Sequence, residues 1–177
     1  MVVYIDLGAD CRHSAQLHAF ALNATWDCAL ARYNHPADAN PHFRPCADGS
    51  RYPDAHRLAD TISIGATYYK VGARAPICRM GKLRGIGNRR VGPYPDGAYR
   101  YFRGQLIFEK MTDLGDSGCI AVRESDNAVT GLNFSSNDTE SLANPLLKIG
   151  WKYQGIIRLE GGGEIPMYDV TNSVVPT

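Results

Sequence analysis

The chain has 177 residues, with 19 Lys or Arg and 18 Asp or Glu, so its net charge of +1 indicates neither a nucleic acid nor a membrane surface as partner. A hydrophobic share of 44% is enough for the core of one ordinary domain. No apolar run approaches the roughly 20 residues that cross a bilayer, and the 18 Gly and 10 Pro predict many turns and short strands.

The first 33 residues are rich in predicted strands. Residues 2–5, VVYI, are β-branched or aromatic and predict a short strand. Residues 14–22 contain good helix formers, so a helix and a strand are both open there. Residues 28–33, preceded by Asp27, predict a buried strand.

Residues 34–60 contain four prolines and little periodicity, which predicts a long connecting segment between two subdomains. His35, His42 and His56 lie there among aspartates, but their spacing matches no usual ligand pattern. We therefore predict no metal site and no cofactor.

From residue 62 onward the sequence predicts short strands separated by Gly, Pro, Asn or Asp. The predicted strands are TYYKVG, PICRMGKLRGIG, AYRYFRGQLIFEK, CIAVRES, AVTGLNFS and KIGWKYQG. Their spacing is typical of an antiparallel barrel or sandwich, so the predicted fold class is mainly β. Residues 139–149 predict a helical turn or two, interrupted by Pro145.

Five cysteines lie far apart without a C-x-x-C pair: Cys11, Cys28, Cys46, Cys78 and Cys119. This pattern argues against a zinc ribbon and against a dense disulfide framework. The opening segment MVVYIDLGADCRHSAQ shows no signal peptide. The compartment is unknown from the sequence, and we expect a reduced, intracellular protein by default.

Residues 70–103 carry nine Lys or Arg and one acid, Asp96. Such a stretch can bind nucleic acid, but its Gly and Pro spacing is typical of strands joined by turns. Basic side chains are common on the outer faces of hairpins. We therefore expect a solvated surface here and do not expect nucleic acid as a partner.

The stretch MTDLGDSGCIAV, residues 111–122, places Ser117 between an acid and a glycine, just before an apolar run. A serine nucleophile needs an adjacent base, and the oxyanion that it creates needs preorganised donors. A turn with Gly115 and Gly118 can present backbone N–H groups beside an exposed hydroxyl, because glycine tolerates angles that a Cβ forbids. An ordinary flexible turn is the alternative.

Residues 111–145 resemble the trypsin-like serine peptidases, the family with the chymotrypsin fold. In that family a G-D-S-G turn precedes a strand, a turn and a second strand, which here read GDSGCIAV, RESDN and AVTGLNFSS, followed by LANPLLKI. YYKVGARAPICRMGKLRGIG is similar to the first hairpin of the family's second barrel, with Ala75 and Arg79 at its usual Thr positions. DCALARY resembles the segment that carries the triad aspartate.

The resemblance implies a trypsin-like antiparallel β-barrel and a peptide or protein substrate. It makes Ser117 the nucleophile, the N–H groups of Gly115 and Ser117 the oxyanion hole, and Asp27 the residue that orients the base. Asp116 is expected to hold the loop. The substrate cleft is expected to be lined by Met111, Leu132, Asn133 and Phe134, and a Met at position 111 argues against a preference for Lys or Arg.

The family's histidine has no clear counterpart, because the T-x-A-H phrase expected before Asp27 is missing. His13 and His18 are the candidates upstream. His13 is only fourteen positions before Asp27, which is short for both side chains to converge. We take His13 as the candidate base and expect a structural role for His18.

These observations predict a first barrel that is only partial and a second that is complete. Residues 1–33 are the expected remnant of the first barrel, residues 34–61 the linker, and residues 62–177 the second barrel. Three functions are open: a trypsin-like serine endopeptidase (or a truncated or degenerate homologue) acting at Ser117, an inactive barrel that binds a peptide or protein, and a basic domain that binds nucleic acid.

Overall fold

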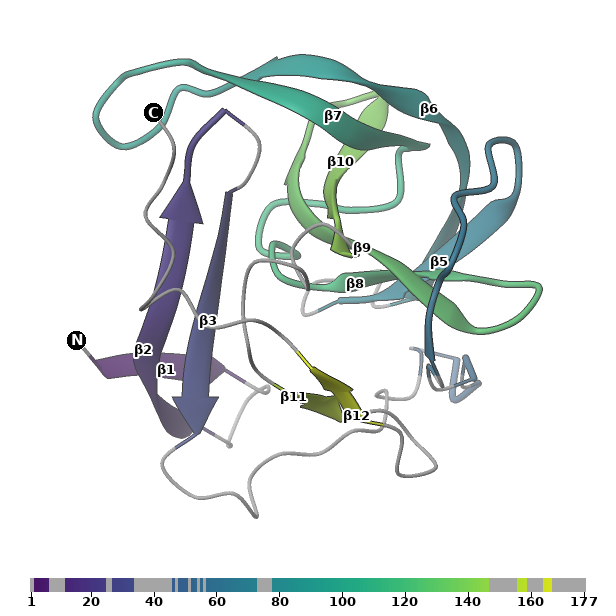
Figure 1. Ribbon diagram of the computed structural model, residues 1–177, viewed down its shortest axis with the longest axis horizontal. Coiled ribbons are helices and arrows are strands. Elements are labelled where there is room, and N and C mark those ends of the chain that lie inside the picture. Colours follow the sequence, from purple (N-terminus) through teal and green to yellow (C-terminus); the bar gives the residue numbers. More distant parts are fainter. Residues whose placement is uncertain are drawn as a thin grey trace.

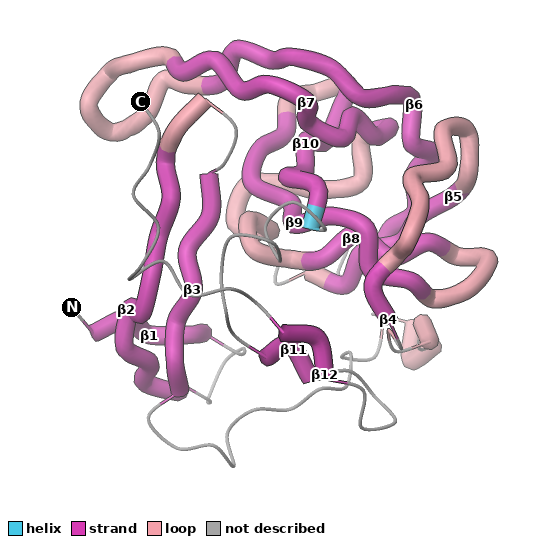
Figure 2. The backbone as a smooth tube through the Cα atoms, in the orientation of Figure 1, coloured by secondary structure: helices cyan, strands magenta, loops and turns pink. Residues whose placement is uncertain are grey.

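The computed structural model describes residues 2–6, 12–24, 27–33, 46, 48–50, 52–53, 55, 57–72, 78–146, 156–158 and 164–166. These residues form strands joined by turns and loops (Figures 1 and 2). The strands are β1 (Val2–Asp6), β2 (Arg12–Leu22), β3 (Asp27–Tyr33), β4 (Arg57–Leu58), β5 (Thr67–Val71), β6 (Cys78–Val91), β7 (Arg100–Glu109), β8 (Ile120–Arg123), β9 (Ala128–Ser136), β10 (Glu140–Pro145), β11 (Ile156–Arg158) and β12 (Glu164–Pro166).

Six strands close into an antiparallel barrel (Figure 1). Hydrogen bonding runs in the order β10–β7–β6–β5–β8–β9, and β9 also pairs with β10, so the sheet returns on itself. β4 pairs with β9 in parallel on the outside. The prediction of a mainly β fold built on an antiparallel barrel is confirmed.

The barrel interior holds the core. On β6, Leu83 is fully buried, while Lys82 and Arg84 on either side are exposed, as the alternating faces of a strand require. The inward residues pack closely, and the rings of Tyr68 and Phe108 meet edge to face with centroids 5.1 Å apart. The core cluster consists of Tyr68, Leu83, Leu106, Phe108, Met111, Ala121 and Ala143.

Strands β1, β2 and β3 form a separate antiparallel sheet beside the barrel (Figure 1). Asn144 of β10 joins the two: its side-chain amide donates to the backbone oxygen of Asp27 at 2.8 Å, and its Oδ1 accepts from the Asp27 N–H at 3.4 Å. The N–H of Arg103 donates to the backbone oxygen of Ala24 at 2.7 Å. These contacts fix the start of β3 against the barrel.

Several local predictions are decided by strand pairing. Residues 12–22 form β2 rather than a helix, because β1 and β3 pair with it on both sides. The helical turn predicted within residues 139–149 is wrong over 140–145, which form β10 between β7 and β9. The start of β3 is less buried than predicted, since Cys28 is half-buried and Ala29 exposed. The strand predicted at 148–155 lies outside the described residues.

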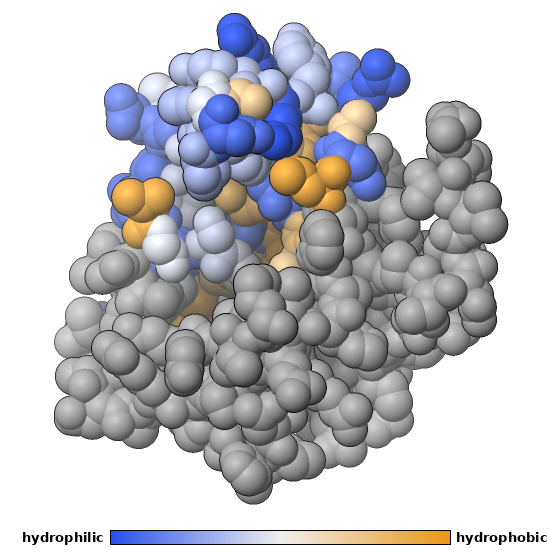
Figure 3. Space-filling model, turned by 90° about the vertical axis from the view of Figure 1, so that its left-hand side faces the viewer, coloured by the Kyte–Doolittle hydropathy of each residue, from blue (hydrophilic) through white to orange (hydrophobic). Residues whose placement is uncertain are grey.

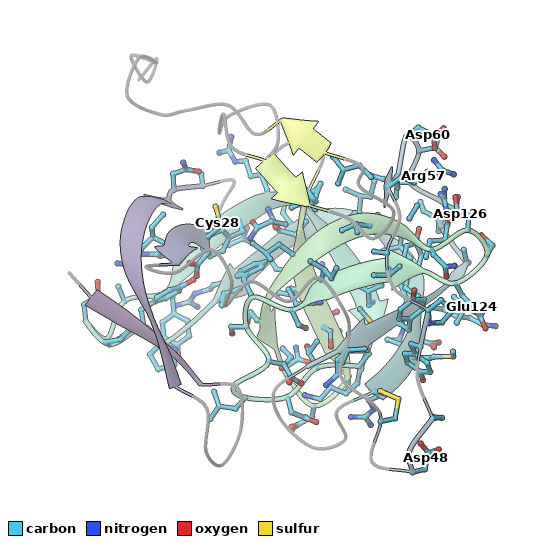
Figure 4. All side chains as sticks on the ribbon, turned by 90° about the horizontal axis from the view of Figure 1, so that it is seen from below. Cys28, Asp48, Arg57, Asp60, Glu124 and Asp126 are labelled. Atoms are coloured by element: carbon cyan, nitrogen blue, oxygen red, sulfur yellow. A yellow bond between two sulfur atoms is a disulfide. The ribbon has the colours of Figure 1, made fainter. Side chains whose placement is uncertain are left out.

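Covalent and ionic contacts brace the barrel from outside. Cys46 and Cys78 form a disulfide, which departs from the expectation of a reduced chain. Arg123 pairs with Asp126 at 2.7 Å, and Arg57 reaches the same carboxylate, so the segment around β4 is tied to the β8–β9 turn. Figure 4 shows Arg57, Asp60 and Asp126 together at this edge. Among the described residues, no helix is long and apolar enough to cross a membrane.

The basic residues of 70–103 have three different environments. Lys70 is fully buried, contrary to the solvated surface expected for this stretch. Several others pair with acids: Arg79 with Asp113, Arg89 with Glu140 and Arg100 with Asp96. Lys82, Arg84, Arg90 and Arg103 are exposed on β6 and β7, and Arg74 lies outside the described residues. The β6–β7 end of the molecule, at the top of Figure 3, is largely hydrophilic.

Candidate active site

Ser117 lies in the loop of residues 110–119 that joins β7 to β8, which we call the Ser117 loop. Its side chain is exposed, and its hydroxyl donates to the backbone oxygen of Phe134 in β9 at 3.3 Å. Gly115 and Gly118 have φ angles of 97° and 92°, a region that residues with a Cβ rarely adopt. The two glycines therefore let the chain turn sharply enough to present the hydroxyl at the surface.

Asp116 anchors the Ser117 loop in the interior. Its carboxylate pairs with Lys70 of β5 at 2.6 Å and accepts from the N–H of Asp113 at 3.0 Å. Both side chains of the ion pair are essentially fully buried, at 0% and 1% exposed. Gly72 makes room for the pair, because a Cβ there would lie 2.1 Å from Asp116 Oδ1. These contacts agree with the expectation that Asp116 holds the loop.

The N–H groups of the loop fall into two sets. One set donates to acceptors in the loop, in β9 or in β10: the N–H groups of Met111, Thr112, Asp113, Asp116, Gly118 and Cys119. Those of Leu114, Gly115 and Ser117 donate to no atom within the part of the chain that the structure describes, and the last two flank the Ser117 hydroxyl in sequence. Two unengaged backbone donors beside an exposed serine hydroxyl are suited to stabilising an oxyanion.

Two grooves meet at Ser117. The wide groove has a volume of about 500 Å³ and is bordered by Asp27, Tyr94, Ser117 and Phe134 among others. The narrow groove has a volume of about 360 Å³ and lies between the Ser117 loop and the end of β9. Its wall is largely polar and includes Thr112 and Asn133. The exposed hydroxyl is therefore accessible from both sides.

Asp27 borders the same wide groove as Ser117. Its carboxylate accepts a hydrogen bond from the hydroxyl of Tyr94 at 2.5 Å. Burial, and then the hydrogen bond to Asp27, raise the pKa of Tyr94 well above its usual range. The phenol is therefore a proton donor and not a base at neutral pH.

The other predicted site residues are spread over the core, the grooves and β2. Phe134 borders both grooves and Asn133 the narrow one. Met111 lies in the barrel core with no exposed surface, and Leu132 is half-buried and borders neither groove. His13 lies in β2 opposite Ile5 of β1, and its side chain is outside the described residues, as is that of His18.

Cys119 is the other nucleophilic side chain near Ser117. Burial, with a smaller effect of the Asp116 charge, raises the pKa of its thiol to about 12. Its sulfur accepts from the side-chain amide of Asn133 at 3.3 Å. Since thiolate is the reactive form, this environment makes the thiol of Cys119 a poor nucleophile.

No group of three or more His, Cys, Asp or Glu that could hold a metal ion occurs within the described ranges. The histidines at positions 35, 42 and 56 lie outside those ranges. The absence of a metal and of a cofactor stays a prediction.

Sequence reasoning missed two residues of the site. For Lys70, the sequence shows only a lysine in a strand with aromatic residues, which predicts an exposed side chain. Tyr94 lies in a turn, 67 positions from Asp27, so only the folded chain brings its hydroxyl to that carboxylate.

Solved structures of bacterial proteases share this fold. The chymotrypsin of Cellulomonas bogoriensis has a TM-score of 0.59 at 18% identity, covering 80% of this chain and 76% of that one. Protease A of Thermobifida fusca has a TM-score of 0.59 at 16% identity, covering 76% and 68%. The Nocardiopsis protease has a TM-score of 0.54 at 17% identity, also covering 76% and 68%.

No protein-family model matches the sequence, and no curated protein matches it significantly. The likeness is therefore one of structure, at identities that show the fold alone. The chain has the chymotrypsin-like β fold of bacterial serine proteases.

Proposed function

We propose that the chain acts on peptide or protein substrates by acyl transfer at Ser117, in the manner of a trypsin-like serine endopeptidase. The observation that carries the proposal is the Ser117 loop itself. Its hydroxyl is exposed where two grooves meet, beside the unengaged N–H groups of Gly115 and Ser117. The buried Lys70–Asp116 pair holds this arrangement in place. The shared fold supports the same chemistry.

In this reaction the Ser117 oxygen bonds to the substrate carbonyl carbon, and its proton passes to a base. The carbonyl oxygen takes the negative charge, which the two N–H groups stabilise. The C–N bond then breaks, the amine leaves with the proton from the base, and water hydrolyses the Ser117 ester. Asp27 would orient the base from across the wide groove, and His13 is the base that the sequence offers.

A second function is favoured by one specific observation. The Asp27 carboxylate is already engaged by the Tyr94 hydroxyl. A groove in which Asp27 stays engaged binds a peptide carbonyl at the Ser117 loop without efficient cleavage, because an unassisted serine hydroxyl is a weak nucleophile. The alternative is therefore a peptide-binding barrel that uses the same groove.

A peptide boronic acid tests the proposal, because boron forms a tetrahedral adduct with a serine oxygen that sits beside oxyanion donors. Boron NMR should show a tetrahedral adduct with the wild-type protein and none with Ser117→Ala. Ser135→Ala is the matched control, since Ser135 borders both grooves without lying in the loop, and it should keep the adduct. Equal boronate binding by Ser117→Ala would contradict the proposal. Binding of the peptide without a tetrahedral adduct would favour the alternative.

A further inference from the structure

Residues 92–99, which we call the hairpin tip, join β6 to β7 and reach toward the start of β3 (Figures 1 and 2). All of them are exposed except Tyr94, which is half-buried. The Tyr94 hydroxyl donates to Asp27 Oδ2 at 2.5 Å. This hydrogen bond, which we call the latch, therefore connects the tip of a barrel hairpin to the separate β1–β3 sheet.

Further contacts hold the ring of Tyr94 in position. The guanidinium of Arg100 stacks over it at 4.4 Å from the centroid and pairs with Asp96 on the same tip at 2.5 Å. The buried ring of Phe102 has its centroid 6.4 Å from that of Tyr94 and packs in turn on Phe134, which borders the wide groove, at 5.0 Å. The Tyr94 ring is thus held in a fixed position at the wide groove, in contact with Asp27, Arg100 and Phe102.

The latch engages one oxygen of the carboxylate on which activation of Ser117 depends. A base that takes the Ser117 proton becomes cationic, and Asp27 can stabilise it only through a hydrogen bond of its own. The Oδ2 atom of Asp27 accepts from a phenol, and this hydrogen bond competes with that of a base for the charge of the carboxylate. The charged groups facing that phenol are Asp27 on β3 and Arg100 on β7, and its raised pKa keeps it protonated at neutral pH.

We propose that Tyr94 regulates the site: its hydroxyl competes with the base for the Asp27 carboxylate, and Ser117 is activated more strongly when the hairpin tip releases that carboxylate. This inference rests on the proposed function of Ser117 and Asp27. Tyr94 acts through Asp27, so it is a positioning residue and not a catalytic one.

The backbone of the tip is bonded to itself. The N–H of Tyr94 donates to the backbone oxygen of Ala98 at 2.9 Å, and that of Gly97 donates to the backbone oxygen of Tyr94 at 2.7 Å. The β6–β7 register ends at the pair Val91 and Arg100, so no ladder bond crosses the tip. Release therefore breaks the latch and the contacts of the Tyr94 ring with Arg100 and Phe102, which belong to β7, but no backbone hydrogen bond of the barrel ladder. A ligand or partner that brings its own donor to Asp27, such as an imidazole, replaces one hydrogen bond with another.

Free imidazole and a fluorophosphonate test this regulation on the full chain. Tyr94→Ala should expose Asp27, so that added imidazole accelerates labelling of Ser117 on the order of 10-fold or more above its effect on the wild type, as expected for removing a hydrogen bond to a charged group. Tyr94→Phe removes only the hydroxyl and should give part of the gain. Asp27→Asn combined with Tyr94→Ala should abolish it. Equal acceleration in wild type and Tyr94→Ala, or a gain that survives Asp27→Asn, would overturn the proposal.

A second readout does not depend on labelling. With tyrosine carrying carbon-13 at Cζ, the Tyr94 signal is identified by its loss in Tyr94→Phe, and its titration reports the latch directly. The pH at the midpoint of the Tyr94 titration should be higher in the wild type than in Asp27→Asn. An unchanged midpoint would overturn the latch. Absence of Ser117 labelling in every variant, with the midpoint shifted as expected, would instead overturn the proposed function and leave the Tyr94–Asp27 contact standing.

Discussion

The Ser117 loop and the hairpin tip border the same wide groove, but they are held by different kinds of interaction. The loop is fastened by the ion pair of Asp116 and Lys70, which is buried in the barrel. The tip is held by the hydrogen bond from Tyr94 to Asp27 and by ion and ring contacts among largely exposed residues. The Ser117 loop is therefore anchored in the barrel core, whereas the hairpin tip is held by contacts near the surface.

This difference shows how a site can combine fixed and adjustable parts. Oxyanion donors need a preorganised position, which a buried anchor supplies at every moment. The carboxylate that orients a base can be engaged or released by an exposed segment, because breaking one half-buried hydrogen bond costs little compared with unfolding. The predictions below separate the two sides by how much stability each contributes.

The largest expected effect is on the anchor. Lys70→Met leaves the Asp116 carboxylate buried without its cation and should lower the free energy of unfolding by about 3–5 kcal/mol. Urea denaturation measures the change. Lys110→Met is the matched control, because Lys110 pairs with the half-exposed Asp113 at 2.9 Å and should change stability far less. Equal losses of stability in the two variants would contradict the claim that the buried pair stabilises the fold more than the half-exposed one.

The disulfide braces the same side of the groove. Cys78 pairs across the sheet with Val71, next to Lys70, and its bond to Cys46 closes a separation of 32 positions. Replacing both cysteines by serine should cost about 2–4 kcal/mol, mainly by freeing the unfolded chain. Thermal unfolding with and without reductant measures it. A protein that melts at the same temperature in both conditions would show that this brace adds nothing.

The Tyr94 latch should contribute less. Tyr94→Phe should lower stability by about 1–2 kcal/mol at pH 8, since one half-buried hydrogen bond to a charged group is lost. The raised pKa of Tyr94 sets the sign with pH: its contribution is complete below the ordinary value of 10.0 and is lost as the pH rises through the folded-state pKa. Denaturation of both proteins from pH 8 to pH 11 measures the difference. A gap that stays constant across this range would mean that the phenol does not hold Asp27.

The smallest expected effect concerns the wall of the wide groove, where Arg89 forms two hydrogen bonds with Glu140. Arg89 lowers the pKa of Glu140 below its ordinary 4.5, so the pair contributes stability above that pH and loses it as the pH falls. Glu140→Gln should cost about 1 kcal/mol at pH 7 and progressively less as the pH falls through the lowered folded-state pKa of Glu140. Matching acid profiles for the two proteins would contradict this assignment.

The sequence predicts what is local. The glycines around Ser117 and the alternation on β6 are properties of neighbouring residues, so the turn and most barrel strands were foreseeable. Contacts between distant residues were not: Lys70 and Asp116 are 46 positions apart, and Tyr94 and Asp27 are 67 apart.

Tertiary pairing also overrides local preference. Residues 140–145 contain helix formers, yet β10 completes the barrel between β7 and β9, and Pro145 falls at its last position. Met111, near the position where a specificity pocket was expected, is instead needed in the core. Local propensity predicts neither the strand at 140–145 nor the burial of Met111, because both depend on closure of the sheet into a barrel.

The central claim is that the Ser117 loop is fixed while the hairpin tip can be released. NMR relaxation dispersion on the backbone amides of the wild-type protein tests it most directly, because release of the tip is expected on the microsecond to millisecond timescale. The account predicts exchange at Asp96 and Gly97 in the hairpin tip, none at Gly115 and Ser117, and altered exchange at the tip in Tyr94→Phe. Exchange at the Ser117 loop with a static hairpin tip would contradict it.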